Sequence, residues 1–409
     1  MALKSKARKV FVSCVPYRSD MAGNEAVLSN TVDLIRDIDR SVEISARSVC
    51  SGAIFDEQAY SRGFQRPLKR ANKRLIREIL NNDIYVWAGS FTIREHPQFL
   101  PRVADMVKLS GRKLILFCCG MNSEDNFTGY KLRSPFRINT LNFMEKLTGT
   151  HIHLVKEYEN RVSCKTAALI KRSLDKADLV LVRDKYTRDC LINTGIKVPV
   201  HTAADPVVML RASGEKRVDD VWAENGLWTG GAPVIGVNLN LNTKARRAKI
   251  KELSCLLDSL VKKTGARILF IPVGPGIDTA DLVSIRSGMK MEKEAAVLKD
   301  CLSPADIAGV ISRTDLVICS DYHFMIFAGV AGTPVAGVSR GKETDDYLRS
   351  FGEKLICSIE ELESDKVISY CEKLLLEGAA INEKTREVIA EMKNAVLKTR
   401  DLVSAVFEM

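Results

Sequence analysis

The 409-residue sequence predicts an α/β fold of two parallel-sheet domains that face a central cleft. Three observations support this prediction. The chain is too long for one ordinary hydrophobic core. Short, continuous apolar runs alternate with longer amphipathic stretches, which is typical of parallel strands covered by helices on both faces. A polar, glycine-bearing segment at residues 211–232 interrupts this alternation.

The continuous apolar runs are rich in β-branched residues and are the predicted strands. In the first domain they cover residues 9–14, 41–46, 83–89, 113–119, 178–183 and 198–203. In the second domain they cover residues 234–240, 266–272, 315–320, 334–339 and 354–358. Amphipathic stretches between them, such as residues 24–38, 163–176, 247–263 and 360–377, are predicted helices.

Polar composition and weak periodicity set the predicted domain boundaries. The N-terminal Rossmann-like domain spans residues 1–212, the linker 213–232, and the C-terminal Rossmann-like domain 233–380. Residues 381–409 are a predicted C-terminal helix, begun by Asn382, that can pack against the first domain. Ligands of open parallel sheets bind beyond the carboxyl ends of the strands, so the candidate functional residues are those that follow each strand.

Composition restricts the partners of this chain. The formal net charge of +10 favours anionic ligands, although a basic surface without a specific partner explains it equally well. The basic residues are dispersed, so nucleic acid is not an expected partner. The 11 cysteines show no CxxC pair or metal-ligand spacing; we expect no metal and a reducing cytoplasm. The apolar runs are too short for a membrane span or a signal peptide, which leaves peripheral membrane contact.

Glycines follow three strands of the first domain. Gly23 is expected to allow a tight turn, and Asn24 to cap the helix after it, whose N-terminus can bind an anion. Gly89, with Ser90, and Gly120 are expected to let a substrate approach the backbone closely. An ordinary turn or a capped surface helix also explains each of these glycines.

Two charged residues follow the fifth and sixth strands. Arg183 can hold a carboxylate or phosphate through a bidentate pair, or it can form a surface ion pair with Asp184. Pro206 keeps the chain extended and directs Asp205 off the strand end. The Asp205 carboxylate can orient an acceptor hydroxyl or cap a turn.

Basic residues and one histidine follow strands of the second domain. Lys244 and Arg247 open a helix and can meet a phosphate, although a solvated basic face explains them as well. His323 opens an almost wholly apolar helix, a position that suits acid–base work better than a buried structural role. Arg340 and Lys342 follow the next strand and add positive charge to the same cleft.

In their order along most of the chain, these segments resemble the motifs of the polysaccharide pyruvyltransferase family. The family's G-D-E-A-I run corresponds to Gly23–Val27, its G-G-G-S strand end to Trp87–Ser90, and its G-Q-G segment to Cys119–Gly120. Its R-D-x-x-S motif corresponds to Arg183–Thr187 and its A-D-P motif to Ala204–Pro206. Its R-L-H-A-L-I-F-A motif appears as Asp321–Ala328, its G-x-P-V as Gly332–Val335, and its Y-D-P-K as Ser339–Lys342.

The resemblance implies a GT-B-like fold and transfer of a pyruvyl group from phosphoenolpyruvate to two hydroxyls of a sugar. The product is a cyclic ketal and phosphate leaves. The implied acceptor is a nucleotide- or lipid-linked glycan precursor at the cytoplasmic side of the membrane, and no cofactor or metal is implied. Such a reaction needs a positioned acid or base and preorganised positive charge for the phosphate.

The same match assigns roles to the candidate residues. His323 is the expected acid or base, and Asp205 the second catalytic residue. The expected donor site comprises Arg183, Arg340, Lys342 and Gly120. The acceptor or a phosphate is expected at Gly23, Asn24, Gly89, Ser90, Lys244 and Arg247.

The sequence departs from the family at one pair of charges. The arginine two residues before the family's histidine is Asp321 here, and the aspartate of Y-D-P-K is Arg340. One hypothesis is that Arg340 supplies the guanidinium while Asp321 holds it or orients His323; the other is that the donor site has diverged. Two further functions stay open: a GT-B glycosyltransferase, with Asp278 or Asp281 near the ribose of a nucleotide sugar, and a binding protein without donor chemistry.

Overall fold

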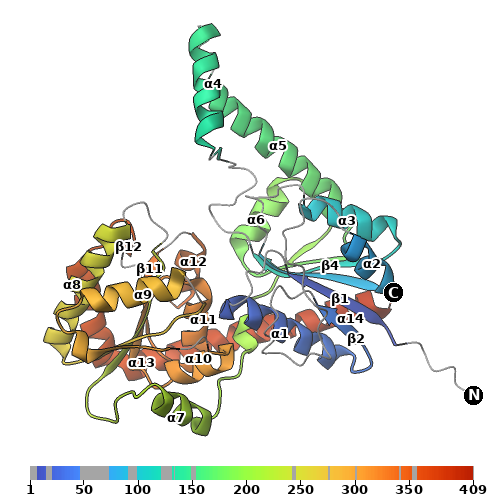
Figure 1. The fold of residues 1–409 in the computed structure, drawn as a ribbon. Helices are drawn as coiled ribbons and strands as arrows, with labels where there is room; N and C mark the ends of the chain where they lie inside the picture. Colours follow the sequence, from blue (N-terminus) through green and yellow to red (C-terminus); the bar gives the residue numbers. More distant parts are fainter. Residues whose placement is uncertain are drawn as a thin grey trace, which may run out of the picture. The chain divides into compact units, whose positions relative to one another are not determined.

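The computed structural model describes residues 7–14, 21–46, 73–90, 99–120, 131–132, 134–148, 153–241, 246–274, 277–299, 302–339, 342–351 and 357–408. The chain folds into two compact units, each with a parallel sheet (Figure 1). Unit 1 comprises Met1–Tyr17, Thr31–Asp205 and Leu397–Met409; unit 2 comprises Arg18–Asn30 and Pro206–Val396. Neither unit is therefore one continuous stretch of sequence.

Unit 1 is built on six parallel strands in the order β2-β1-β3-β4-β5-β6. They are β1 (Lys9–Cys14), β2 (Glu43–Ala46), β3 (Ile84–Ser90), β4 (Lys113–Gly120), β5 (Leu179–Val182) and β6 (Val200–Thr202). The central strands β4 and β5 are buried almost throughout, as expected for strands covered on both faces. All six strands predicted for the first domain are confirmed, with small shifts at their ends.

The helices around this sheet are α1 (Ala22–Ile38), α2 (Lys73–Asn81), α3 (Phe99–Leu109), α4 (Pro135–Thr148), α5 (Leu154–Leu174), α6 (Lys185–Asn193) and α14 (Thr399–Glu408). The first residues of α1, up to Asn30, belong to unit 2. Val107 of α3 and Ile170 of α5 pack with Leu116 of β4 in one buried cluster. Helix α4 contributes no buried residue.

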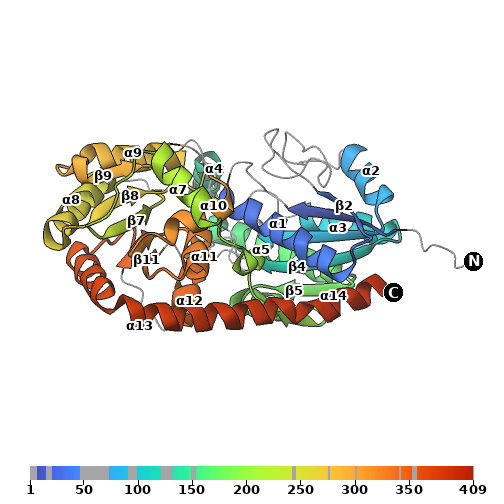
Figure 2. The same ribbon diagram turned by 90° about the horizontal axis from the view of Figure 1, so that it is seen from below.

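Unit 2 has six parallel strands in the order β12-β11-β10-β7-β8-β9. They are β7 (Val234–Asn238), β8 (Arg267–Phe270), β9 (Ala295–Val297), β10 (Leu316–Cys319), β11 (Val335–Ser339) and β12 (Cys357–Ser358). The helices are α7 (Glu215–Glu224), α8 (Arg246–Thr264), α9 (Ile277–Gly288), α10 (Pro304–Ile311), α11 (Tyr322–Ala331), α12 (Lys342–Ser350) and α13 (Ser364–Leu397). Figure 2 shows α13 as the long red helix.

Two predicted segments and one missing strand differ from the prediction. The predicted linker, residues 213–232, contains α7, which is amphipathic and buries Val218 and Val221 in unit 2. Strand β9 was not predicted, because three residues carry too little periodicity to be recognised. The predicted helix 381–409 is split: Asn382 lies inside α13, and α14 follows as a separate helix that belongs to unit 1. The end of the chain is thus part of the first sheet unit.

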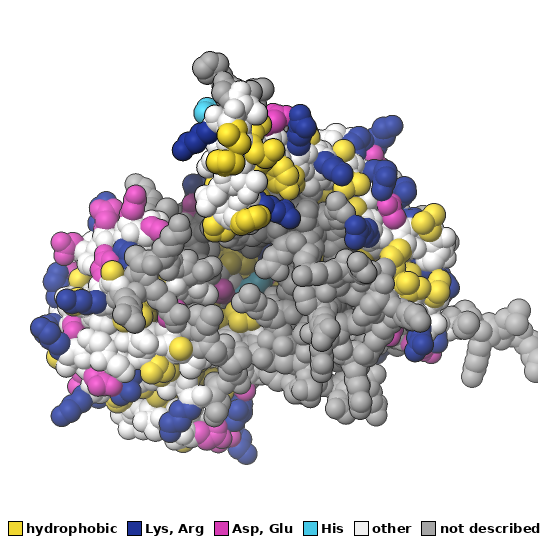
Figure 3. Space-filling model, turned by 45° about the horizontal axis from the view of Figure 1, so that its top comes forward, with side chains coloured by type: hydrophobic (Ala, Val, Ile, Leu, Met, Phe, Trp, Pro, Cys, Tyr) yellow, Lys and Arg dark blue, Asp and Glu magenta, His cyan; other side chains and the backbone are white. Residues whose placement is uncertain are grey.

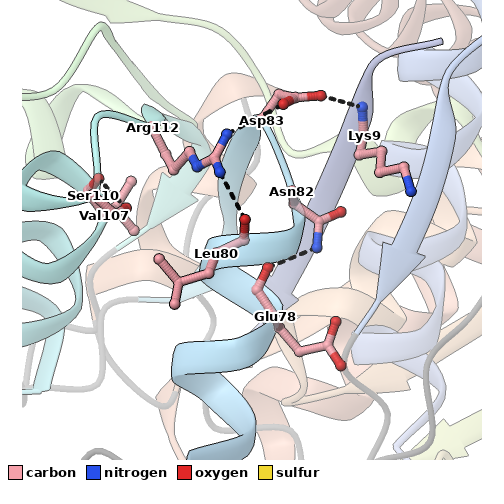
Figure 4. Close-up of polar contacts among 8 residues, drawn as sticks. All are labelled: Lys9, Glu78, Leu80, Asn82, Asp83, Val107, Ser110 and Arg112. Carbon is pink, nitrogen blue, oxygen red and sulfur yellow. Dashed lines mark hydrogen bonds and ion pairs between the residues drawn. The ribbon is translucent and has the colours of Figure 1, made fainter. Parts of the chain in front are cut away.

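Charged residues anchor the amino ends of the unit 1 strands (Figure 4). The backbone N–H of Lys9 donates to Asp83 Oδ2 at 2.9 Å. Arg112 donates to Asp83 Oδ1 at 3.3 Å and to the carbonyl oxygen of Leu80 at 2.7 Å. Because ligands of parallel sheets bind at the opposite, carboxyl edge, these charges have a structural role.

Among the described helices, none combines the length and apolar character needed to cross a bilayer.

Candidate functional site

The strand order of unit 2 identifies the edge where a ligand is expected. Numbered from β7, the strand order is that of doubly wound sheets. In these sheets the first three strands extend to one side of the first strand and the later strands to the other, so the order reverses between the first and fourth strands, here β7 and β10. These two strands pair in parallel from Leu316–Ile235 to Cys319–Asn238. Ligands bind outside the carboxyl ends of the strands at such a switch point. The residues after Asn238 and Cys319 are therefore the first to consider.

Polar groups line the carboxyl edge at this switch point. The fully buried Asn238 donates from its side-chain Nδ2 to the backbone carbonyl oxygen of Ile271 at 2.8 Å. The backbone carbonyl oxygen of Asn238 accepts from Ser320 N at 3.0 Å. Ser320 Oγ in turn accepts from Asn240 N at 3.0 Å. Within the described residues, Asn238 Oδ1 has no hydrogen-bond partner. Buried polar atoms are usually paired, so this oxygen is an exception at the carboxyl edge of the sheet.

His323 lies three residues after Ser320, in the first turn of α11. The helix begins at Tyr322, one residue earlier than predicted, and Asp321 is its N-cap: Asp321 Oδ1 accepts from Phe324 N at 3.0 Å. His323 is half-buried, whereas the helix behind it, from Phe324 to Gly329, is fully buried. The buried apolar body of α11 thus fixes the position of a histidine at the sheet's carboxyl edge.

Gly23 makes room for that histidine. Helix α1 begins beside β8, where Ala22 N donates to the carbonyl oxygen of Val273 at 2.8 Å. A Cβ on Gly23 would lie 2.7 Å from His323 Cβ and closer still to the ring atoms around Nδ1. The expected tight turn at Gly23 and cap at Asn24 are wrong, because α1 already begins at Ala22 and both residues lie in its first turn. What requires glycine here is the imidazole.

Aromatic side chains also pack against His323. The rings of Tyr322 and His323 pack edge to face with centroids 5.3 Å apart, and Tyr322 packs in the same way on Tyr347 at 5.7 Å. Tyr347, from α12, donates its hydroxyl to the carbonyl oxygen of Met325 at 3.3 Å and packs on Phe351 at 4.8 Å. Edge-to-face pairs favour defined ring orientations, so α12 helps to orient the imidazole.

Unit 1 contains a second group of predicted residues, centred on Arg183. Its side chain is 3% exposed and its Nη1 lies 2.8 Å from Asp205 Oδ2, on a side chain that is 1% exposed. Asp184 Oδ2 lies 3.7 Å from Arg183 Nε, and Asp184 also caps α6 by accepting from Thr187 N at 2.6 Å. The sequence left open whether this arginine forms a surface pair or binds a ligand; the pair that it does form is buried.

The end of β4 is shaped around this arginine. A Cβ on Gly120 would overlap Arg183 Nε, so only glycine fits beside the guanidinium. Cys118, two residues earlier, has a φ of 49° at a break in the register between β4 and β5, a backbone conformation that costs a non-glycine residue about 1–3 kcal/mol. Gly89 has a φ of 93° at a break in the register between β3 and β4, which by itself requires glycine.

The structure thus brings the predicted residues into two groups, Gly23 with His323 in unit 2 and Gly120 with Arg183 and Asp205 in unit 1. Lys244 and Arg340 lie outside the described residues. Ser90, Arg247 and Lys342 lie in β3, α8 and α12, and their side chains are not among those described. Asp281 is buried in α9. The described partner of Asp321 is the helix backbone, which gives this residue a capping role.

Four residues were not predicted: Asn238, Ser320, Tyr322 and Tyr347. Asn238 ends β7 and Ser320 directly follows β10, so a search for polar residues at the carboxyl end of each buried strand would have found both. The contribution of Tyr347 to the position of His323 depends on the approach of α12 to α11, which no local pattern reveals.

Comparison with known proteins adds a family and a fold. A family model for polysaccharide pyruvyl transferases matches residues 22–342. No curated protein sequence matches the chain. Similar solved structures include the UDP-GlcNAc 2-epimerase from Neisseria meningitidis bound to UDP-GlcNAc, with a TM-score of 0.60 and 11% identity over 98% of this chain and 100% of that one.

Two further structures resemble the whole chain. HepE from Anabaena, in complex with UDP and glucose, has a TM-score of 0.60 and 11% identity over 98% of this chain and 99% of its own. A ugt transferase from Siraitia grosvenorii, in complex with UDP, has a TM-score of 0.56 and 11% identity over 97% and 98%. At such identities the likeness shows the fold alone, which is GT-B-like with two Rossmann-like parallel sheets.

Proposed function

The chain belongs to the polysaccharide pyruvyl transferase family, and from this membership we propose that it transfers a pyruvyl group from phosphoenolpyruvate to two hydroxyls of a sugar. The acceptor in this proposal is a nucleotide- or lipid-linked precursor of a polysaccharide in the cytoplasm. The observation that carries the proposal is the position of His323 at the switch point of unit 2. Its ring packs against Gly23, and a larger residue at position 23 would displace the ring.

The reaction balances without a redox step. The C2 carbon of phosphoenolpyruvate forms two new C–O bonds to the sugar, and its bond to the phosphate oxygen breaks. One hydroxyl proton ends on the C3 methylene, which becomes a methyl group, and the other ends on the released phosphate. Protonation of C3 creates the electrophilic centre, so a positioned proton donor is the main chemical requirement.

His323 is the group that we assign to this proton transfer. Imidazole exchanges a proton near neutral pH, and here its ring is fixed between Gly23 and Tyr322. It also lies in the first turn of α11, where the helix dipole favours a nearby anion such as a carboxylate or phosphate.

We assign Arg183 to binding the negative charge of the donor. The guanidinium is held by Asp205 and lies beside Asp184, so a donor would meet an arginine whose geometry is already set. Asp205 is then a residue that positions Arg183. The earlier assignment of Asp205 as a catalytic residue therefore gives way to a positioning role in this proposal.

The test follows the proton and the phosphate. The full chain is incubated in D₂O with phosphoenolpyruvate and a panel of nucleotide- and lipid-linked sugars, and phosphate release is followed by ³¹P NMR. We expect a product whose mass contains the added pyruvyl ketal and whose methyl group carries one deuterium. The variant His323→Gln should bind phosphoenolpyruvate but lose about 10²–10⁴-fold in rate, the usual contribution of a general acid or base.

The matched control is His153→Gln, which changes an exposed histidine in unit 1 and should leave the rate unchanged. Two results would reject the proposal: turnover that is equal in the two histidine variants, or an absence of binding and turnover of phosphoenolpyruvate with every acceptor.

One alternative has its own support. The fold neighbours named above were solved with UDP, glucose or UDP-GlcNAc, which favours a glycosyltransferase that uses a nucleotide sugar. That function predicts thermal stabilisation by one nucleotide sugar alone, since a ligand stabilises in proportion to RT ln(1 + [L]/Kd). Stabilisation by phosphoenolpyruvate without any nucleotide sugar would reject this alternative.

A further inference from the structure

Helix α4 presents an exposed apolar face. Phe136, Phe143, Met144 and Leu147 are between 50% and 80% exposed, and the helix has no buried residue. With 3.6 residues per turn, these four positions fall on one side of the helix. Figure 3 shows the hydrophobic side chains gathered over α4 at the top of the view. Contiguous apolar surface of this kind marks an interaction site.

The opposite face of α4 rests on α5. Ile138 and Leu141 are half-buried on that side. Glu145 Oε1 lies 3.2 Å from His153 Nδ1, and Glu145 Oε2 accepts from Leu154 N at 3.2 Å. The apolar face is therefore directed away from α5 and contributes nothing to the core of unit 1.

Positive charges flank the apolar face. Arg137 lies beside Met144 on one side, and Lys146 lies on the other side; both are exposed. In the part of the chain that the structure describes, neither forms an ion pair. Glu145 is the one acidic residue of the α4 sequence, and it is directed toward α5.

We propose that α4 docks this chain on the surface of an anionic lipid bilayer. Its apolar side chains enter the boundary between headgroups and acyl chains, and Arg137 and Lys146 contact the anionic headgroups. A helix with aromatic and aliphatic residues on one face and basic residues at its margins binds membranes in this manner, parallel to the surface. The net charge of +10 adds long-range attraction to the same surface.

A second copy of the chain fits this face less well. Stable protein interfaces bury about 800 Å² on each partner, and the two aromatic side chains of this face, at about 150–250 Å² each when fully buried, supply only part of that area. A contact between two copies would also bring together two Arg137 and two Lys146 side chains without a carboxylate on either face. A bilayer requires no complementary shape and provides the opposite charge.

Vesicle sedimentation tests the proposal on the full chain. Vesicles of equal parts phosphatidylglycerol and phosphatidylcholine should retain the protein, and vesicles of phosphatidylcholine alone should retain much less. Phe136→Ser with Phe143→Ser should weaken binding about tenfold or more, because the apolar area buried sets the strength. Arg137→Gln with Lys146→Gln should weaken binding and reduce its dependence on salt between about 0.1 M and about 1 M.

Leu376→Ser is the matched control, since Leu376 on α13 is 87% exposed and the change removes a similar apolar side chain elsewhere. Circular dichroism establishes that each variant is folded. Equal binding by the Phe136/Phe143 variant and the control would overturn the proposal. Failure of the unaltered chain to bind anionic vesicles would also overturn the proposal. If, in addition, light scattering shows a dimer that the Phe136/Phe143 variant loses, the face belongs to a second copy of the chain.

Discussion

At the scale of single residues, two glycines adapt the backbone to a functional side chain. Gly23 and Gly120 both have ordinary backbone angles for any residue, yet a Cβ at either would overlap a side chain from a distant strand end. His323 occupies the space beside the first, and Arg183 the space beside the second. Their side-chain positions therefore depend on the absence of one carbon atom.

The change Gly23→Ala tests this dependence. We expect it to destabilise the protein by about 1–3 kcal/mol in urea unfolding, as overpacking usually does, and to shift the imidazole resonance of His323. Gly378→Ala is the control: that glycine lies inside α13 with no atom near its missing Cβ, so alanine should stabilise the helix by about 0.5–1 kcal/mol. Equal effects of the two changes would contradict the account given for Gly23.

The buried pair of Arg183 and Asp205 predicts an asymmetric response. Asp205→Ala leaves the buried guanidinium without the Asp205 carboxylate and should cost about 3–5 kcal/mol of unfolding free energy. Arg183→Met with Asp205→Leu removes both charges and should cost less than that single change. Urea denaturation measures all three proteins. Glu157→Ala, which breaks an exposed pair with Arg161, should be almost neutral; a similarly small effect of Asp205→Ala would contradict the prediction.

The cysteines should differ sharply in reactivity. Burial, and to a smaller extent the Asp205 carboxylate, raises the pKa of the Cys118 thiol well above its usual value. Burial, followed by Asp321, does the same to the pKa of Cys319. Because the thiolate is the reactive form, both should resist iodoacetamide at neutral pH, whereas the exposed Cys164 and Cys255 react. Peptide mapping measures the labelling, and early labelling of Cys118 in the folded chain would contradict the prediction.

At the scale of elements, close packing joins α11 to α13. A Cβ on Gly329 of α11 would lie 2.8 Å from Ile389 Cδ1 and 2.8 Å from the Tyr347 hydroxyl. The buried helix that carries His323 is thus fixed by a glycine contact with the long helix of unit 2. The hydrophobic pattern of either helix does not predict that the other packs against it.

The change Gly329→Ala should therefore destabilise unit 2, and Ile389→Val should restore part of the loss by removing the Cδ1 atom. In the unaltered background Ile389→Val alone should cost about 0.5–1.5 kcal/mol. Thermal unfolding of the two single variants and the double variant measures the coupling between the sites. Strictly additive effects would show that the two helices do not press on each other at this point.

The same scale shows where local patterns were sufficient. Strands such as β4 and β10 were predicted because a continuous apolar run reports burial on both faces. Helix α7 was taken for a linker because only Val218 and Val221 mark its buried side, in a segment otherwise rich in polar residues and glycine. The start of α1 was placed too late, since the residue that precedes the helix offers no capping side chain of the preferred kind.

At the scale of the whole molecule, the two units exchange segments. Unit 1 includes the last helix, α14, and unit 2 includes the first turns of α1. In α14, Val403, Val406 and Phe407 are buried, and Arg400 donates to the carbonyl oxygen of Asp37 at 2.9 Å. Helix α14 therefore completes a unit whose strands all come from the first half of the chain.

Removal of residues 397–409 should consequently destabilise unit 1 and not only the end at which the cut is made. Loss of Phe407 alone should cost about 3–5 kcal/mol, the usual value for a buried aromatic changed to alanine. Hydrogen exchange should accelerate in β4 and β5 and remain slow in β10. Glu408→Ala, at an exposed position of α14, is the control. Unchanged protection of β5 in the shortened chain would contradict the prediction.

The sequence by itself determined the α/β class, the approximate positions of most strands, the family, and the residues that follow the strands, because each depends on neighbours close in the chain. Only the tertiary structure decided that Gly23 meets His323 and that Arg183 pairs with Asp205. Those contacts depend on which strand ends become adjacent, and parallel strands from distant parts of the sequence are joined by the order of the sheet, which local periodicity does not encode.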